Sequence, residues 1–530
     1  MRRTQQPATT RADGQSDGGT GSARAPCILA GLVLIGSVLA LVLAAVILRQ
    51  TWHGDPAIYL SYARNIAAGD VFTFNPGEFS SGSTSPLWAA LLALPFALGL
   101  GPAGAKALAA LALAAAWLSC VVAARRLGAG LLGASVAAAA VLALATTPSL
   151  LLFESALTIL TVTWGAVFLE RVAAGSARAW AGLALCWALL PMVRPDAVLL
   201  VPLAALVLLR AGPVAIGPSR VLGALAAASV PALLYFGASW ILTGHASAPA
   251  ACRGFALREG AARLFGIPYA LGGVFAFSAS PLVLLGLFAL AGRPSPRTRG
   301  TGSATWRWAL LSVATYAFVV TFVSPVAGGT DRYLLPVVPL LGLAAARPLD
   351  RVATLRLAGR DVLLPGALVV ALAAVPLARV VLDARAESRR GYALDTILER
   401  EIAERVNAAL PSGGTVLAYE VQARYYLDRG VRLLSLDGIT DGRVAPYLAS
   451  GDMGAFLRAE RPALWIANDA VRYRPYLARS ILRYASDALG TRTGQSLEID
   501  GVRFTLLAVN ERPRIPDFAG WTQLVRLEYL

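Results

Sequence analysis

Ionisable side chains stand beside apolar runs at five places in the sequence, and these residues are the ones that could do chemistry. A charge at membrane depth is costly, so it usually serves a function or forms a pair. A carboxylate close to a hydroxyl can act as a general base, and an arginine can bind a phosphate through two parallel hydrogen bonds. Such residues would suit transfer of a group from a phosphate-bearing donor to a hydroxyl. In chain order they are Asp55 in GDPAIY, Glu154 in LLFESALT, Arg194 and Asp196 in MVRPDAV, His245 in LTGHASAP, and Asp331 and Arg332 in GGTDRYLLP.

Asp55 lies in a polar and aromatic stretch from Trp52 to Trp88, which follows an apolar run and precedes a mostly apolar chain. We interpret this stretch as the first extracytoplasmic loop and Asp55 as its catalytic carboxylate. A structural alternative stays open, because Asp55 could cap a helix over Ala57–Ala68 with Pro56 at its first position. The two roles are compatible.

The other charged candidates also have structural alternatives. Arg194 and Asp196 could form an ion pair at the end of a span, and Arg332 could be an arginine that reaches from the membrane to its interface. His245 could be an ordinary loop histidine. Glu154 is harder to explain without a function, because it directly follows an apolar run.

Basic and aromatic side chains accompany Asp55 in the first loop. Arg64 falls on the expected helix, and we expect it to pair with a nearby carboxylate or a lipid headgroup rather than to act in chemistry. Aromatic rings could stack on sugars, although aromatic residues at a membrane interface need no such role. The aromatic candidates are Tyr59, Tyr62, Phe72, Phe74 and Trp88.

Composition places the chain in a membrane. It has 530 residues, of which 57% are hydrophobic and 15% charged, and its mean hydropathy is +0.62. Soluble domains have about a quarter of charged residues. The formal charge of +16 comes from arginines in short runs between apolar segments. That pattern indicates membrane topology rather than nucleic-acid binding.

Several classes of protein lack their signatures here. The two histidines, His53 and His245, argue against a multi-histidine metal centre or a haem site. Four cysteines, mostly in apolar runs, cannot form a disulfide framework. A Gly-rich loop followed by Lys and Ser or Thr is missing, so the sequence shows no nucleotide-binding motif that could drive transport.

Arginine positions set the expected orientation. Residues 1–26 have the composition of a disordered cytoplasmic tail. The run from Cys27 to Leu48 is long enough to cross the bilayer and lacks a cleavage site, so it is expected to be an anchor. If the short segment Pro86–Leu100 also crossed, Arg125 and Arg126 would lie outside, against the positive-inside rule. We therefore expect it to lie along, or dip into, the outer surface.

The chain is expected to cross the membrane about eleven times, with its N-terminus inside and its C-terminus outside. A membrane domain would cover 27–383, with the first loop at 50–105. The spans after the first are expected at Lys106–Ala124, Leu131–Thr147, Ser155–Leu169, Trp180–Val193, Ala197–Leu209, Val221–Leu242, Ala270–Ala291, Trp308–Val323, Leu334–Ala346 and Val362–Val380.

From about residue 384 the composition changes. An amphipathic stretch at Leu394–Ala409 precedes short β-rich runs, and strands that alternate with helices predict a small α/β domain. By the span count this domain, 384–530, is extracytoplasmic. The expected strands are Thr415–Tyr419, Val431–Leu436, Ala463–Ala467 and a hairpin of Ser496–Ile499 with Val502–Val509.

The order of these motifs resembles the GT-C superfamily of polyprenyl-phosphate-sugar-dependent glycosyltransferases, in particular the bacterial terminal arabinofuranosyltransferase branch. The resemblance rests on DPAIYLSYARNIAAG followed by FNPGE and GSTSPLW. It continues through FESALT, VRPDAVLL, LTGH, DRYLLPVVPLL and ARYYLDRGVRLLSLDGITD, and thus covers nearly the whole chain after the tail.

The resemblance implies an enzyme of a bacterial inner (plasma) membrane. It would transfer a sugar, such as arabinofuranose, from a polyprenyl-phosphate donor to a cell-envelope glycan, glycolipid or protein on the extracytoplasmic side, with inversion. Asp55 would activate the acceptor hydroxyl, and Arg332 would contact the donor phosphate. The further candidates for substrate or donor binding are Glu154, Arg194, Asp196, His245, Tyr59 and Arg64.

Two points stay open within this resemblance. Some relatives use a divalent cation, such as Mg, Mn or Ca, which Asp55, Glu154 and Asp331 could bind if the fold brings them together. Gly54 stands where the first of two paired aspartates is usual. A non-catalytic binder or scaffold for lipid-linked glycans is therefore one alternative. A lipid or glycan transporter is another, in which buried charges would lie near the bilayer midplane.

Overall fold

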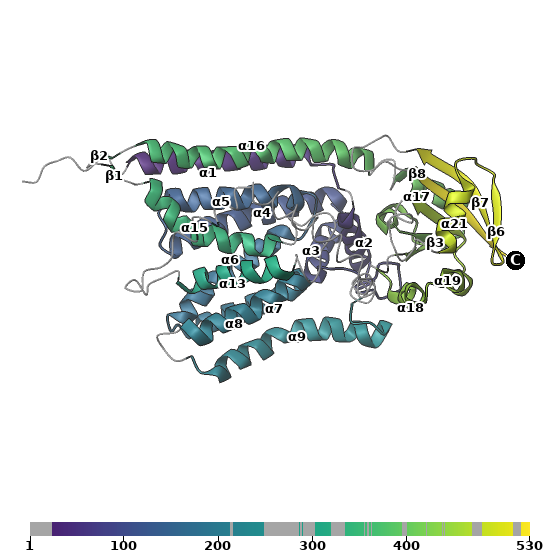
Figure 1. Ribbon diagram of the computed structural model, residues 1–530, viewed down its shortest axis with the longest axis horizontal. Coiled ribbons are helices and arrows are strands. Elements are labelled where there is room, and N and C mark those ends of the chain that lie inside the picture. The colour runs from purple at the N-terminus through teal and green to yellow at the C-terminus, as the bar shows by residue number, and fades with distance from the viewer. Residues whose placement is uncertain are drawn as a thin grey trace, which may run out of the picture.

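Apolar helices make up most of the chain and lie side by side in one bundle, which carries a sheet at one end (Figure 1). This architecture comes from a computed structural model. The structure describes residues 24–52, 54–211, 216–247, 286, 289, 303–319, 334–353, 356–357, 360–361, 363–394, 400–419, 421–436, 438, 440–468, 480–511 and 521–530.

Five described helices are long and apolar enough to cross a membrane, namely Pro26–Ile47 within α1 together with α4, α5, α6 and α9. The protein is thus a multi-pass membrane protein, while the expected count of eleven spans stays a prediction. The expected span Ala270–Ala291 lies outside the described residues, except for 286 and 289. The bundle helices are α1 (Arg24–Ile47), α4 (Gly101–Arg126), α5 (Leu131–Leu150), α6 (Ser155–Ala173), α7 (Ala179–Val193), α8 (Leu200–Ala211), α9 (Pro218–Thr243), α13 (Ser303–Phe318), α15 (Val338–Ala353) and α16 (Leu363–Leu394).

The first loop folds into two short helices at one end of the bundle, α2 (Asp55–Ala67) and α3 (Pro86–Ala97) (Figure 1). The 12 residues of α3 span about 18 Å, which is too short to cross about 30 Å of hydrocarbon. The prediction that this segment lies along the outer surface stays a prediction. The short strands β1 (Arg356–Leu357) and β2 (Arg360–Asp361) pair at the opposite end of the bundle.

Small residues let the bundle helices approach closely. α16 lies along α1 and also packs on α5, and the Ser388 hydroxyl donates a 3.4 Å hydrogen bond to the carbonyl oxygen of Ile47. At the far end, the carboxylate of Asp350 accepts a 3.0 Å bond from the Gly130 amide, just before α5 begins. Such contacts stabilise a bundle in which lipid gives no hydrophobic drive for helix association.

The C-terminal residues form a six-stranded sheet with the order β4-β3-β5-β8-β7-β6. β3 pairs in parallel with β4 and β5, and the other neighbours are antiparallel. Five of these strands lie within a residue or two of their predicted bounds, whereas β8 was not predicted. The strands are β3 (Gly414–Ala418), β4 (Val431–Ser435), β5 (Leu464–Asn468), β6 (Ser496–Ile499), β7 (Val502–Glu511) and β8 (Trp521–Tyr529).

Each face of this sheet has its own apolar core. One core contains residues of α18 (Ala445–Ser450), α19 (Met453–Glu460) and α21 (Ile481–Leu489). The other contains residues of α17 (Glu401–Ala409) and, from the first loop, residues of α2. The sheet and the first loop therefore share one continuous core, and Figure 1 places them together at the same end of the bundle.

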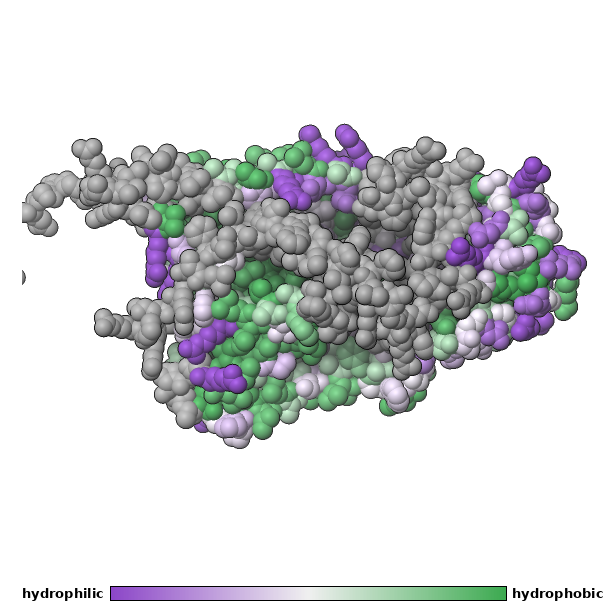
Figure 2. Space-filling view, in the orientation of Figure 1, coloured by the Kyte–Doolittle hydropathy of each residue, from purple (hydrophilic) through white to green (hydrophobic). Residues whose placement is uncertain are grey.

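The surface agrees with a membrane setting. In Figure 2 hydrophobic residues gather over the flank of the bundle formed by α8 and α9, and hydrophilic residues gather at its two ends. On α9, the side chains of Leu233, Leu234 and Ile241 are 69%, 69% and 82% exposed. Exposure of such large apolar side chains is expected where lipid replaces water.

Candidate functional site

A buried cluster of three charges joins the ends of α6 and α7. Arg194 donates a 2.7 Å bond from one terminal nitrogen to Oε1 of Glu154, and both side chains are 4% exposed. Its other guanidinium nitrogens meet both carboxylate oxygens of Asp196, at 3.0 and 3.2 Å. The ion pair considered for Arg194 and Asp196 is therefore present, and Glu154 is its third member.

Local sequence explains how these side chains come to point at one another. Arg194 precedes Pro195, which disfavours helical geometry in the residue before it, so α7 ends there in an extended conformation with φ −150° and ψ 125°. Asp196 then lies on η1 (Pro195–Leu199). Its backbone carbonyl oxygen accepts a 2.7 Å hydrogen bond from the hydroxyl of Tyr316. Glu154 is the N-cap of α6, but its carboxylate does not cap that helix and is directed to Arg194 instead.

The loop before Glu154 is strained. Leu152 has a φ of +76°, which is rare for a residue with a side chain, and it is fully buried. The indole of Trp88, on α3, donates a 2.7 Å hydrogen bond to the carbonyl oxygen of Leu152. Strained backbone of this kind persists where the surroundings hold it, often beside a functional site.

Tyr59 ties the first loop to this cluster. Its hydroxyl donates to Oε2 of Glu154 at 2.9 Å and lies 2.7 Å from the hydroxyl of Thr84. Asp55 is four residues earlier on α2, so it lies about one turn, or about 6 Å, along the same face of the helix. The structure thereby brings the predicted base onto the helix that contacts Glu154.

Asp55 is the first residue of α2 rather than its cap. Gly54 holds the N-cap position of α2, and Asp55 follows it in the first turn. Gly54 adopts φ 69° and ψ −141°, a conformation that residues with a Cβ rarely adopt. An aspartate would be strained at this position, which explains physically why a glycine stands before Asp55.

The aromatic residues of the first loop are mostly core residues. Tyr59, Tyr62, Phe74 and Trp88 are 2% exposed or less, because they pack between α2, α3 and the sheet. Burial also raises the pKa of Tyr62 well above its usual range. The prediction that these four rings offer stacking faces to a sugar is therefore wrong, and of the five only Phe72 is partly exposed.

The remaining candidates lie elsewhere or outside the described residues. His245 follows α9, and its ring packs so closely against Gly442 of the C-terminal sheet region that a side chain at Gly442 would clash with it. Asp331 and Arg332 lie outside the described residues, as does His53. Their predicted roles therefore stay predictions.

The metal site is not assembled from the residues that the structure describes. No group of three His, Cys, Asp or Glu side chains among them is placed to hold an ion. Both oxygens of Glu154 already accept hydrogen bonds, one from Tyr59 and one from Arg194. Asp331, the third predicted ligand, lies outside the described residues, so the metal site stays a prediction.

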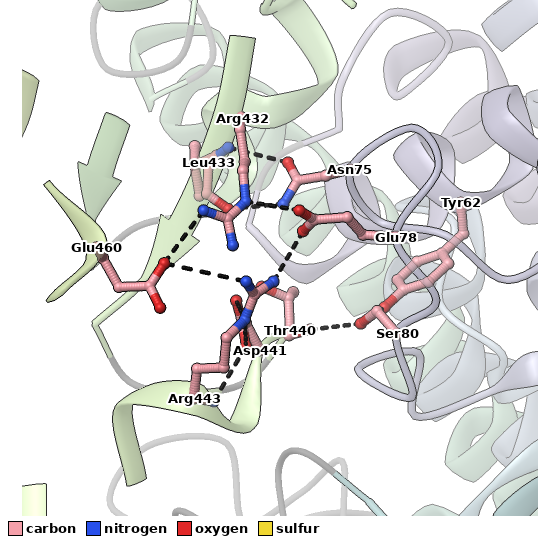
Figure 3. A network of polar contacts seen from close by, with 10 residues as sticks. All are labelled: Tyr62, Asn75, Glu78, Ser80, Arg432, Leu433, Thr440, Asp441, Arg443 and Glu460. Atoms are coloured by element: carbon pink, nitrogen blue, oxygen red, sulfur yellow. Dashed lines mark hydrogen bonds and ion pairs between the residues drawn. The ribbon is translucent and has the colours of Figure 1, made fainter. Parts of the chain in front are cut away.

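A second polar network fixes the first loop to the sheet (Figure 3). The side-chain amide of Asn75 donates to the carbonyl oxygen of Leu433 at 3.0 Å and accepts from its amide at 2.9 Å. Glu78 forms ion pairs of 2.7 Å with Arg432 and 2.8 Å with Arg443. These contacts join the FNPGE segment to β4 and to the loop that follows it.

Three more contacts extend this network. The hydroxyl of Ser80 donates to the carbonyl oxygen of Thr440 and lies 2.6 Å from the hydroxyl of Tyr62. Glu460 is 3.1 Å from Arg432, so the sheet side of the network also carries its own carboxylate. The charges in this network are therefore matched.

Arg64 has a different environment from the one expected. It donates a 2.8 Å bond to the carbonyl oxygen of Tyr425, and its guanidinium lies 5.5 Å from the centre of the Tyr425 ring. In the described part of the chain it has no carboxylate partner, so the predicted pairing with a carboxylate is not observed. Burial lowers the pKa of Arg64.

Sequence reasoning missed the residues on the sheet side of these contacts. Arg424, on η5 (Val421–Tyr426), is fully buried beside Arg64, but an arginine in a soluble-looking segment gives no signal of burial. Asn75 belongs to the FNPGE motif, yet its partner Leu433 is 358 residues away. Only the folded chain could reveal such a pair.

Comparison with known proteins supports the fold. No protein-family model and no curated protein matches the chain. The solved structure of ArnT from Cupriavidus metallidurans, bound to undecaprenyl phosphate, matches with a TM-score of 0.56 and 15% sequence identity, covering 93% of this chain and 98% of that chain. This chain has a GT-C fold.

The GT-C resemblance drawn from the first-loop motifs is thus confirmed at the level of fold. The arabinofuranosyltransferase AftD from mycobacteria also matches, with a TM-score of 0.48 and 14% identity. That match covers 93% of this chain but 40% of AftD.

Proposed function

We propose that this GT-C protein is an inverting glycosyltransferase. It moves a sugar from a polyprenyl-phosphate donor to a cell-envelope glycan, glycolipid or protein on the extracytoplasmic side of a bacterial inner membrane. The observation that carries the proposal is the position of Asp55, which begins the helix whose next turn bonds the buried Glu154–Arg194–Asp196 cluster through Tyr59. The ArnT structure, which contains undecaprenyl phosphate, supports the class of donor.

In this proposal Asp55 takes the proton from the acceptor hydroxyl as that oxygen attacks the anomeric carbon of the donor sugar. The new bond forms on the face opposite the bond to phosphate, which breaks and leaves the lipid phosphate with both electrons. Arg332 neutralises the charge of this leaving group.

The charged cluster positions the helix rather than reacting. Glu154 and Asp196 are both paired with Arg194, and these bonds fix the orientation of all three side chains. Tyr59 transmits the position of this cluster to α2, one turn from Asp55. His245 and Arg64 remain substrate-binding candidates in the proposal, because each lies where the bundle meets the C-terminal sheet region.

The test is sugar transfer in proteoliposomes supplied with a radiolabelled polyprenyl-phosphate sugar and an envelope glycan acceptor. Asp55→Asn removes the base but keeps the size of the side chain, and it should abolish transfer in a protein that still folds. Glu498→Gln, in an exposed pair with Arg503 on the far edge of the sheet, is the matched control and should transfer normally. Arg332→Ala should weaken donor binding.

Full activity of Asp55→Asn would rule out Asp55 as the base. Unchanged donor affinity in Arg332→Ala would remove Arg332 from the donor site. If the wild-type protein binds the donor but transfers no sugar to any envelope acceptor, the non-catalytic binder is the better description.

A further inference from the structure

The contact between the first loop and the sheet region is charge-balanced in one part and unbalanced in another. In the network of Figure 3, Arg432 and Arg443 each face carboxylates from Glu78 and Glu460. Between α2 and η5, two further arginines have buried guanidinium nitrogens without such partners. This contrast within one interface requires an explanation.

Arg424 is the more deeply buried of the two, with 0% of its surface exposed. One terminal nitrogen donates to the carbonyl oxygens of Leu427 and Asp428, at 3.2 and 3.3 Å. Its Nε and its second terminal nitrogen are buried and have no hydrogen-bond partner. Arg64 is in the same condition, because only the nitrogen bonded to Tyr425 has a partner while its Nε and second terminal nitrogen have none.

Neighbouring groups do not compensate these charges. Arg429 lies near enough to lower the pKa of both arginines, and its own carboxylate partner, 2.6 Å away, is Asp70. Burial, together with the charges of Arg64 and Arg429, lowers the pKa of Arg424 to about 10. Asp428 is the one carboxylate that opposes this effect. A buried cation and unsatisfied donors are both costly, so a fold keeps them where something else is gained.

We propose that Arg64 and Arg424 form a binding site for a phosphate-class oxyanion. Together they present four unpaired N–H positions, the Nε and a terminal nitrogen of each guanidinium. These two positions on one guanidinium form the fork that suits two oxygens of a phosphate group. A doubly charged phosphate monoester would pair with both guanidiniums at once, whereas one carboxylate would satisfy a single fork.

A phosphate bound here would join two distant parts of the chain. Arg64 belongs to α2, the helix that begins with Asp55, and Arg424 belongs to η5 of the C-terminal region. The Tyr425 ring already packs against the guanidinium of Arg64 and orients it. Anion binding would therefore stabilise the contact between the proposed catalytic helix and the sheet region. The phosphate could be a lipid headgroup or a soluble phosphate, since the recognition chemistry is the same.

Thermal unfolding of the full-length protein in detergent tests the site with two probes. The first is inorganic phosphate, titrated against sodium chloride of equal ionic strength, and the second is dodecyl phosphate, titrated against dodecyl maltoside. Wild-type protein should show a saturable rise in Tm with at least one probe. A response to inorganic phosphate indicates a soluble phosphate, and a response to dodecyl phosphate alone indicates a lipid headgroup.

Variants then locate the response. R424Q and R64Q should each weaken the apparent affinity about 10- to 100-fold, because each loses charge-assisted hydrogen bonds. R443Q, which alters an arginine with carboxylate partners, should keep the wild-type affinity. R424K keeps the positive charge but not the two parallel N–H donors, so it should show an intermediate affinity. If R424Q does not fold, R424K takes its place in the test.

No saturable response of the wild-type protein to either probe would overturn the site. So would wild-type affinity in both R64Q and the Arg424 variant that folds. Anion binding is measured without any sugar transfer, so its failure is distinguishable from loss of activity in Asp55→Asn.

Discussion

Asn75→Ala should loosen the first loop from the sheet by removing its pairing with the edge strand. β4 is at the edge of the sheet, so its outer backbone groups have no strand to pair with. Asn75 is 5% exposed and pairs with both the amide and the carbonyl of Leu433, at 2.9 and 3.0 Å. Its side chain thereby forms the two hydrogen bonds that a neighbouring strand would form with Leu433.

The magnitude follows from the two hydrogen bonds. Each buried group left unsatisfied costs about 1–3 kcal/mol, and partial access of water reduces the sum, so we expect a loss of about 2–4 kcal/mol. That free energy corresponds to about 30- to 1000-fold easier opening of this contact. Hydrogen exchange measures the opening, because a protected amide exchanges in proportion to the population of its open state.

The assay is hydrogen exchange with mass spectrometry on the peptide that covers β4. Asn75→Ala should accelerate exchange at Leu433 by the factor above, and Asn75→Asp should have a smaller effect, since it keeps the acceptor for the Leu433 amide. Glu498→Ala, at the opposite edge strand β6, serves as the control. Exchange at β4 that stays at the wild-type rate in Asn75→Ala would refute the reasoning.

Two further predictions concern the bundle. Glu154→Gln leaves the buried Arg194 with one charged partner fewer, and it should lower the free energy of unfolding by about 3–5 kcal/mol. A lower Tm in detergent would show this loss, whereas an unchanged Tm would mean that the pair contributes no stability. For topology, single cysteines introduced at Ala250 and Gly300 should react with membrane-impermeant reagents from opposite sides, and labelling from the same side would contradict the expected orientation.

Local signals predicted most elements of this fold. Most described apolar runs form helices, although α16 continues to Leu394, well past the expected end at Val380. The hairpin of β6 and β7 followed from its alternating pattern and tight turn. β8 was missed, although it is the strand that connects the hairpin to β5. Its pairing with β5 places Leu464 opposite Arg526, and contact between segments so far apart in the chain has no signature within a short window of sequence.

The candidate site shows the same division between local and long-range information. Glu154 and Arg194 were each recognisable, because a charge beside an apolar run is rare. Their 2.7 Å contact was not predictable, since 40 residues separate them and only the packing of α6 against α7 brings them together. Tyr59 was recognised as aromatic but misread, because its hydroxyl rather than its ring does the binding.

The composition changes near residue 384, but this position lies inside α16, which continues along the bundle to Leu394. An apolar core then joins the first loop to the sheet. Ile58, Tyr62 and Phe74 of the first loop share a core with Val416 and Leu433 of the sheet, and all five are 5% exposed or less. Interfaces between separable domains are usually more polar than this. The sheet region therefore completes the apolar core against which α2 packs, and this core helps to fix the helix that begins with Asp55.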